Sequence, residues 1–280
     1  KWLLAPYQAF GQRDDMVVLS AEHRGYGESI TDGDQKLPEY ISIDEALADY
    51  HDVRIAYQER FPCTWLLYGC SYGGGLVIHY AHEYPQDGRI AICSSGVTDW
   101  NAMLPEYDDA VRQNLGDALY ERLCCHIDAL SPAKPFDKNW VAREKIYAVV
   151  TALAQFRDYG SLIGAVNTMS KLSTGAFMAS INMIDKLFAK HEIADYAKSN
   201  SAYTLSAEQA RTGRYSWRVW RYQQAFQTGT YWAPSSSRSI YRRTEEDWMA
   251  ESELLFGKKA TVFAHGTGWN VRAMVDELRI

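Results

Sequence analysis

A serine stands between two glycines at residues 69–73, where the chain reads Gly-Cys-Ser-Tyr-Gly. The apolar run 64–69 before it is typical of a buried strand, and the stretch 74–84 after it has the spacing of a helix. G-x-S-x-G between a strand and a helix presents its serine hydroxyl as a nucleophile. Gly69 and Gly73 are expected because a Cβ at either position would strike the neighbouring strand or helix. The alternative, a glycine-rich bend, is less favoured because strand, motif and helix occur in the required order.

The chemistry expected here is attack of the Ser71 hydroxyl on a carbonyl carbon. The helix that follows directs its free amides and partial positive charge at the same point. We expect the backbone amide of Tyr72 to be one donor to the oxyanion of the tetrahedral intermediate. This chemistry requires no cofactor and no metal ion.

A general base must take the proton from the serine, since a serine hydroxyl alone is a poor nucleophile. Of the seven histidines, His265 is the most base-like, because it ends the apolar run 260–265. A surface or packing role is favoured for it nevertheless. His79 and His82 lie one helical turn apart, but no H-E-x-x-H pattern surrounds them, so a structural role is strongly preferred over a metal site.

Two further groups of residues could contact a substrate. His23 and Arg24 follow an apolar run and could orient a substrate carboxylate or the loop. Ion pairing within the scaffold, for example with Glu22 or Glu28, is an equal alternative. Four aromatic residues could line a proline-sized pocket, although a role in the core of a helical region is preferred for most of them. These are Trp217, Trp220, Tyr222 and Trp232.

The elements that must position the serine alternate between strand and helix over the first hundred residues. Strands are predicted at 16–24, 64–69 and 88–95, and helices at 42–61 and 74–84, the first capped by Ser42 and Glu45 in an S-x-x-E capping box. This order predicts right-handed crossovers and a parallel sheet covered on both faces. Helical spacing then dominates to about residue 257, and a strand is predicted at 260–265. The predicted domains are 1–98, a helical insertion at 99–257, and a return to the core at 258–280.

Composition excludes several classes of partner. The chain of 280 residues has 29 basic and 35 acidic side chains and a formal net charge of −6, which argues against nucleic acid or an anionic membrane surface. No apolar run reaches the ~20 residues that cross a bilayer, so no membrane span is expected. The five cysteines fit no zinc pattern. Cys63 and Cys93 are expected to be buried, whereas Cys124 and Cys125 are either free thiols or disulfide partners.

The combination of "AEHRGYGES", "ALADY", "YGCSYGGGL" and "SSGV", followed by "SWRVWRYQQAFQTGTYW" and "LFG", resembles the serine peptidases that include lysosomal prolyl carboxypeptidase and dipeptidyl peptidase II. The resemblance implies an α/β fold. Its sheet would be of the α/β-hydrolase type and mostly parallel, with a helical cap insertion. It also implies a peptide substrate, cleavage near proline by an exopeptidase, and a secreted, periplasmic or lysosomal location. Assembly as a homodimer is left open.

Several positions depart from the pattern of that family. Cys70 stands where the family usually has glycine, and Ala225 and Ser252 stand at or near two cysteines of a disulfide, so that disulfide is expected to be lost as a pair. The family's catalytic aspartate lies in an Asp-Pro-Trp motif with the histidine further on, and this chain contains no Asp-Pro-Trp. We therefore expect the chain to be truncated at both ends, and to react weakly or not at all with a fluorophosphonate.

Two alternatives to the exopeptidase remain at this point. An esterase or a proline iminopeptidase would keep the fold, since "HRGYGES" also resembles the R-G-x-G-x-S loop of the iminopeptidases. A truncated relative without its base would instead be a non-catalytic binding module.

Overall fold

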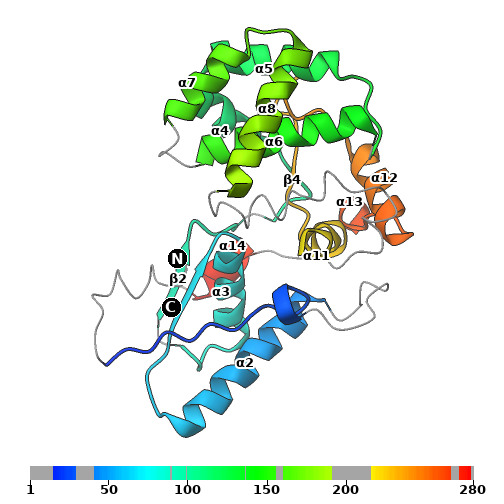
Figure 1. The fold of residues 1–280 in the computed structure, drawn as a ribbon. Coiled ribbons are helices and arrows are strands. Elements are labelled where there is room, and N and C mark those ends of the chain that lie inside the picture. Colours follow the sequence, from blue (N-terminus) through cyan, green and yellow to red (C-terminus); the bar gives the residue numbers. More distant parts are fainter. Residues whose placement is uncertain are drawn as a thin grey trace. The chain divides into compact units, whose positions relative to one another are not determined.

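The computed structural model describes residues 15–29, 41–88, 90–98, 100–135, 137–155, 160–190, 216–265 and 271–278. The chain divides into two compact units (Figure 1). Residues 1–100 and 268–280 form the first unit, and residues 101–267 form the second. Residues 258–265, which were expected to return to the core, group with the second unit.

The first unit is built on a parallel pair of strands. β1 (Leu66–Cys70) pairs with β2 (Ile90–Ser94), with Leu66 opposite Ile90 and Cys70 opposite Ser94. The helix α3 (Tyr72–Glu83) connects the two strands and packs against both. Strand, helix and parallel strand make the unit an α/β structure, in agreement with the predicted class.

Two more helices complete the core of this unit. α2 (Ile43–Arg60) begins where the sequence predicted, because the Ser42 hydroxyl accepts a hydrogen bond from the Glu45 amide at 3.1 Å. α14 (Val271–Leu278) packs against α3. The shared core joins residues of α2, α3 and α14 with Trp100: Ile43, Leu47, Leu76, Ile78, Tyr80, Trp100 and Val271.

The strand predicted at 16–24 is wrong. Residues 16–23 form no strand, and a short 3-10 helix, η1 (Gly27–Ser29), follows them. Val17 is 71% exposed. An apolar run becomes a strand only when a neighbour pairs with its backbone and covers its side chains, and this run has neither among the described residues.

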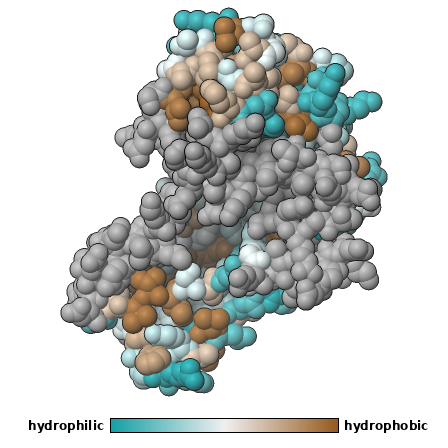
Figure 2. Space-filling view, viewed as in Figure 1, coloured by the Kyte–Doolittle hydropathy of each residue, from teal (hydrophilic) through white to brown (hydrophobic). Residues whose placement is uncertain are grey.

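Apolar residues reach the surface of the first unit (Figure 2). Leu66 is 38% exposed and Ile90 55% exposed, although both lie in strands. Within the described residues the β1–β2 sheet has two strands, so each has one edge without a neighbouring strand. The predicted coverage of both faces is therefore incomplete in the described part of the chain.

His79 on α3 makes stability depend on pH. Burial lowers the pKa of His79 from 6.5 to about 4, partly opposed by the charge of Asp44. Between pH 4 and 6.5 the unfolded chain therefore binds more protons than the folded one, so the free energy of unfolding falls as the pH drops through this range. Discounted for partial exposure, the loss from pH 7 to pH 5 should be about 1 kcal/mol. Urea unfolding of wild type and His79→Gln at both pH values measures it, and an unchanged pH dependence in the variant would contradict it.

The second unit is mainly helical. Its helices are α4 (Pro105–Leu115), α5 (Asp117–Ala129), α6 (Lys138–Gln155), α7 (Gly160–Met169), α8 (Thr174–Lys190), α11 (Ser216–Gln223), the π-helix η4 (Gln224–Thr228), α12 (Glu245–Phe256) and α13 (Val262–His265). Two short strands, β3 (Met103–Leu104) and β4 (Tyr231–Trp232), pair in parallel. The main core gathers apolar side chains from α4 to α8, with Ile240 and Tyr241 packed among them.

The strand predicted at 260–265 is also wrong, because this segment is the helix α13. Val262 is 2% exposed and packs with Tyr231 and Trp248. A short apolar run is compatible with either element, and burial on one side of four residues suits a helical turn. The Thr261 amide donates to the Ala225 carbonyl at 2.9 Å, which fixes the entry to α13.

A buried group of charged and aromatic side chains lies within the second unit. Arg243 pairs with Glu144 and, at 2.5 Å, with Glu251. Its guanidinium lies 4.8 Å from the Trp140 ring centroid and 4.1 Å from that of Trp248. Burial lowers the pKa of Arg243, but the two carboxylates raise it above its usual value. Arg243 is therefore charged and pairs with both carboxylates at once.

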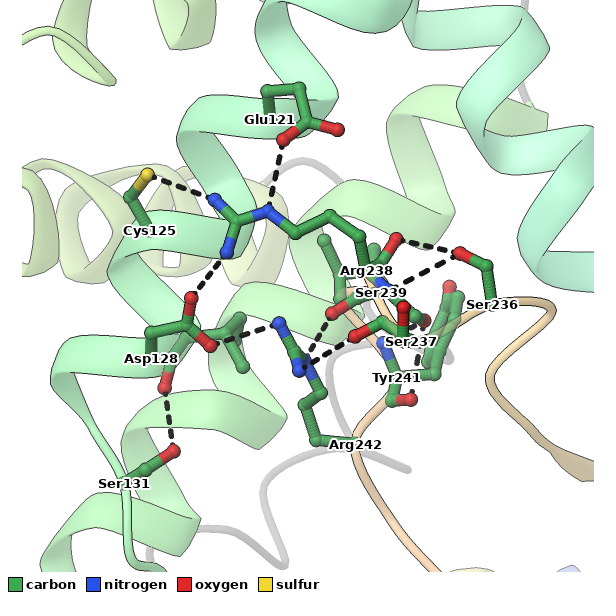
Figure 3. Close-up of polar contacts among 12 residues, drawn as sticks. Glu121, Cys125, Asp128, Ser131, Ser236, Ser237, Arg238, Ser239, Tyr241 and Arg242 are labelled. Carbon is green, nitrogen blue, oxygen red and sulfur yellow. Dashed lines mark hydrogen bonds and ion pairs between the residues drawn. The ribbon is translucent and has the colours of Figure 1, made fainter.

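A second group of charges lies at the surface of the same unit (Figure 3). Arg238 reaches across to α5, where Nε lies 2.9 Å from Glu121 and Nη1 lies 2.5 Å from Asp128. Arg242 pairs with the other oxygen of Asp128 at 2.9 Å. The Arg238 side chain is 40% exposed, so these pairs lie in a more strongly screened environment than those of Arg243.

All five cysteines are free thiols. Cys63 is exposed and Cys93 is half-buried, so the expectation of burial is wrong for Cys63. Cys124 is buried, whereas Cys125 is exposed beside Arg238. Among the helices that the structure describes, none combines the length and the apolar character needed to span a membrane.

Candidate functional site

Ser71 lies at the turn between β1 and α3, where the sequence placed it. Its backbone angles are φ 56° and ψ −124°, and its side chain is exposed at the residue before the first turn of α3. A positive φ in a residue with a Cβ costs about 1–3 kcal/mol and persists only where the surroundings impose it. The hydroxyl makes no capping hydrogen bond to the helix.

The end of β2 holds this turn in place. The Ser71 amide donates to the Ser94 carbonyl at 3.1 Å. The Ser71 carbonyl accepts from the Gly74 amide at 2.9 Å and from the Val97 amide at 3.4 Å. Hydrogen bonds to the backbone on both sides of Ser71 thus offset the cost of its conformation.

The two motif glycines have different roles. A Cβ on Gly69 would lie 1.9 Å from the Gly73 carbonyl oxygen and 2.7 Å from Val77 Cγ2, as predicted. A Cβ on Gly73 would meet nothing within 4 Å among the described residues, so the predicted clash there is wrong. The close approach belongs instead to Gly74, where a Cβ would lie 2.6 Å from Gly96 Cα. The run of three glycines at 73–75 was the available signal for this contact.

Tyr72 is the first residue of α3, so its amide is one of the four that a helix leaves without an intrahelical acceptor. The partial positive charge of the helix N-terminus lies at the same point. The backbone is therefore arranged as an oxyanion donor requires, although the role of the Tyr72 amide stays a prediction.

His23 and Arg24 belong to the scaffold around this turn. Arg24 donates through Nε and Nη2 to both carboxylate oxygens of Asp49, each at 2.6 Å, and through Nη1 to Glu45 at 3.0 Å. The predicted ion pairing within the scaffold is confirmed, with partners on α2. The Glu28 side chain lies outside the described residues, and Glu22 accepts hydrogen bonds from Ser29.

The base remains unassigned. His265 ends α13, but its side chain lies outside the described residues, so its role stays a prediction. In the described ranges, no imidazole or carboxylate is hydrogen-bonded to the Ser71 hydroxyl. His82 pairs with Glu277 at 2.8 Å, and within those ranges no cluster of potential metal ligands occurs.

The aromatic residues proposed as pocket walls contribute mainly to packing. Tyr222 is buried against Phe226 and Phe256, and Trp232 packs on the main core of the second unit. Trp220 is half-buried, and the Trp217 side chain lies outside the described residues. The core role preferred from the sequence is thus confirmed for Tyr222 and Trp232.

Residues 2–128 match the family model described as Serine carboxypeptidase S28, and this stretch contains the whole turn at Ser71. Over these residues the chain is similar to this serine peptidase family. The chain is 30% identical over 105 residues to human thymus-specific serine protease, and 29% identical over 104 residues to a protein of Caenorhabditis elegans that is named as a serine protease. Each match covers 35% of this chain and spans 20% of the relative's length. No solved structure matches the chain significantly.

Ala225 and Ser252, at or near which a disulfide was expected to be missing, lie outside the matched residues 2–128. Ala225 and Ser252 are buried, and they contact consecutive residues of the segment that leads into α13. The Ser252 hydroxyl accepts from the Ala260 amide at 2.7 Å, and the Ala225 carbonyl accepts from Thr261. Hydrogen bonds to one backbone segment thus connect the two positions at which a disulfide was expected to be missing.

Proposed function

We propose that this chain is part of a serine peptidase in which Ser71 is the nucleophile and the Tyr72 amide is an oxyanion donor. The observation that carries the proposal is the positive φ of Ser71 directly before α3. This conformation exposes the hydroxyl at the N-terminus of a helix, where negative charge is stabilised. The similarity of residues 2–128 to a family of serine peptidases supports the same assignment.

The proposed reaction begins when Ser71 Oγ attacks the carbonyl carbon of a peptide bond and its proton passes to a general base. The tetrahedral oxyanion accepts a hydrogen bond from the Tyr72 amide. The C–N bond then breaks, the amine leaves with the proton, and water releases the acyl group from Ser71 in a second attack. Without a base the first step is slow by several orders of magnitude.

The finer features of the proposal rest on the resemblance. They are an α/β-hydrolase-type sheet, a helical cap formed by residues 99–257, and an exopeptidase that cleaves near proline. The two-stranded sheet and the helical second unit are compatible with this architecture.

A fluorophosphonate probe tests the nucleophile, with the adduct located by mass spectrometry. We expect a slow adduct on Ser71 that Ser71→Ala removes. Ser95→Ala is the matched control, because Ser95 is also exposed with a positive φ of 48° and follows the neighbouring strand. An adduct that survives Ser71→Ala, or none in the wild type, would contradict the assignment.

The substrate arm of the same experiment uses three classes of compound: a peptide with proline before its C-terminal residue, a dipeptide amide ending in proline, and a simple acyl ester. Turnover of either prolyl substrate that Ser71→Ala abolishes supports the exopeptidase. Turnover of the ester alone would favour the esterase.

A further inference from the structure

The side chain of Tyr72 is held on two sides. His23 Nε2 lies 3.1 Å from the Tyr72 hydroxyl, and the two ring centroids are 5.8 Å apart. Trp100 lies against the same tyrosine ring at 5.7 Å, and its own Nε1 donates to the Val97 carbonyl at 2.6 Å. The residue that follows Ser71 is thus fixed by contacts far along the chain.

The hydrogen bonds of His23 determine where its proton lies. Nδ1 lies 2.7 Å from the Arg24 carbonyl oxygen, which can only accept, so Nδ1 carries a proton. Burial lowers the pKa of His23, partly opposed by this backbone hydrogen bond, so the ring is neutral at pH 7. Nε2 is then unprotonated and accepts a hydrogen bond from the Tyr72 hydroxyl.

His23 is in turn anchored to a helix. Its neighbour Arg24 makes a two-point hydrogen bond to Asp49 on α2. Paired bonds between a guanidinium and a carboxylate fix orientation as well as distance. The path from α2 through Arg24 and His23 to Tyr72 therefore runs through directed hydrogen bonds.

We propose that His23 is a positioning residue for the oxyanion site: by accepting the Tyr72 hydroxyl hydrogen bond, it holds the first residue of α3 and its amide in place beside Ser71. This inference rests on the proposed function. His23 acts through Tyr72 and touches no reacting atom. Ser71 has a backbone conformation that its neighbours must impose, so a tether on the next residue helps to impose it. Small displacements of such donors are costly to the reaction.

Two substitutions at His23 distinguish the role of Nδ1 from that of Nε2. Asn places its amide near the position of Nδ1, so it can donate to the Arg24 carbonyl but does not reach Tyr72. Gln extends to the position of Nε2, where its oxygen can accept from the tyrosine. Tyr72→Phe removes the donor from the other side.

The first measurement is the rate of fluorophosphonate labelling at Ser71, normalised to the folded fraction. Loss of one neutral hydrogen bond should lower it about tenfold in His23→Asn and in Tyr72→Phe. His23→Gln should recover to within about threefold of wild type. The double variant His23→Asn with Tyr72→Phe should be no slower than either single one. Wild-type rates in both single variants, or losses that multiply, would overturn the proposal.

The second measurement does not depend on reactivity. Nitrogen-15 NMR of the chain labelled at histidine and tyrosine reports the protonation of His23 Nε2 and the environment of the Tyr72 amide. We expect an unprotonated Nε2 at pH 7, and a Tyr72 amide signal that shifts in His23→Asn and returns in His23→Gln. If the wild type does not label, the proposed function fails. The NMR measurement still tests whether His23 holds Tyr72, because it does not depend on the reactivity of Ser71. An amide signal that does not move in His23→Asn would overturn the positioning role.

Discussion

Arg243→Met should lower the free energy of unfolding of the second unit by about 3–5 kcal/mol. The substitution keeps much of the side-chain volume but leaves the carboxylates of Glu144 and Glu251, 4% and 3% exposed, without their nearest cation. An uncompensated buried charge is among the most destabilising changes in a protein interior. Arg221 pairs with the two carboxylates at 3.8 Å and 3.5 Å, but its single positive charge can balance only one of the two negative charges.

The measurement is urea unfolding of the chain labelled with fluorotryptophan, followed by fluorine-19 NMR, which gives each tryptophan its own signal; Trp140 and Trp248 lie against Arg243. Because the two units could unfold separately, the transition is assigned by the signal of these two residues. Arg238→Met is the matched control: it removes an arginine with two carboxylate partners from the surface, where solvent screens the pairs and we expect a much smaller loss. Equal losses in the two variants would contradict the distinction between buried and exposed pairs.

Gly69→Ala should destabilise the first unit by about 3 kcal/mol, whereas Gly73→Ala should change its stability by about 0.5 kcal/mol or less. The alanine Cβ at 69 would collide with backbone atoms of Gly73 in α3, which cannot move without disturbing the helix. At 73 the Cβ has room within the described structure, and alanine is the better helix former.

Thermal unfolding of the two variants, followed by far-ultraviolet circular dichroism, compares them directly. The pair is matched because the same methyl group is added four residues apart in one motif. A Gly73→Ala protein as unstable as Gly69→Ala would mean that the turn tolerates no side chain at either glycine.

Local patterns in the sequence predicted the elements around Ser71 well, because strand, turn and helix there follow consecutively along the chain. The cap at Ser42 was predictable for the same reason. The segments 16–24 and 260–265 were not, since a short apolar run becomes strand or helix according to what packs against it. Val17 has no strand beside it among the described residues, and Val262 has Tyr231 and Trp248.

The nucleophile of the candidate site could be predicted from the sequence, whereas the contacts around it could not. The motif located Ser71 and Gly69, whose roles depend on neighbours within four residues. The partners of Arg24 and of Tyr72 lie 25 and 49 residues away, respectively, and no local pattern connects residues at such distances. The room for a Cβ at Gly73 likewise depends on which atoms surround it in the folded chain, and the local sequence does not determine that.

The packing of α14 against α3 has a consequence during synthesis. Val271 is fully buried among Leu76 and Trp100, so the core of the first unit lacks a component until residues 271–278 have left the ribosome. All of residues 101–267 are translated in between, which takes about 10–30 s at synthesis rates of about 5–20 residues per second. Of these two units, the first therefore lacks part of its core until after the second has been translated, and the apolar face of α3 that packs against α14 stays uncovered throughout that interval.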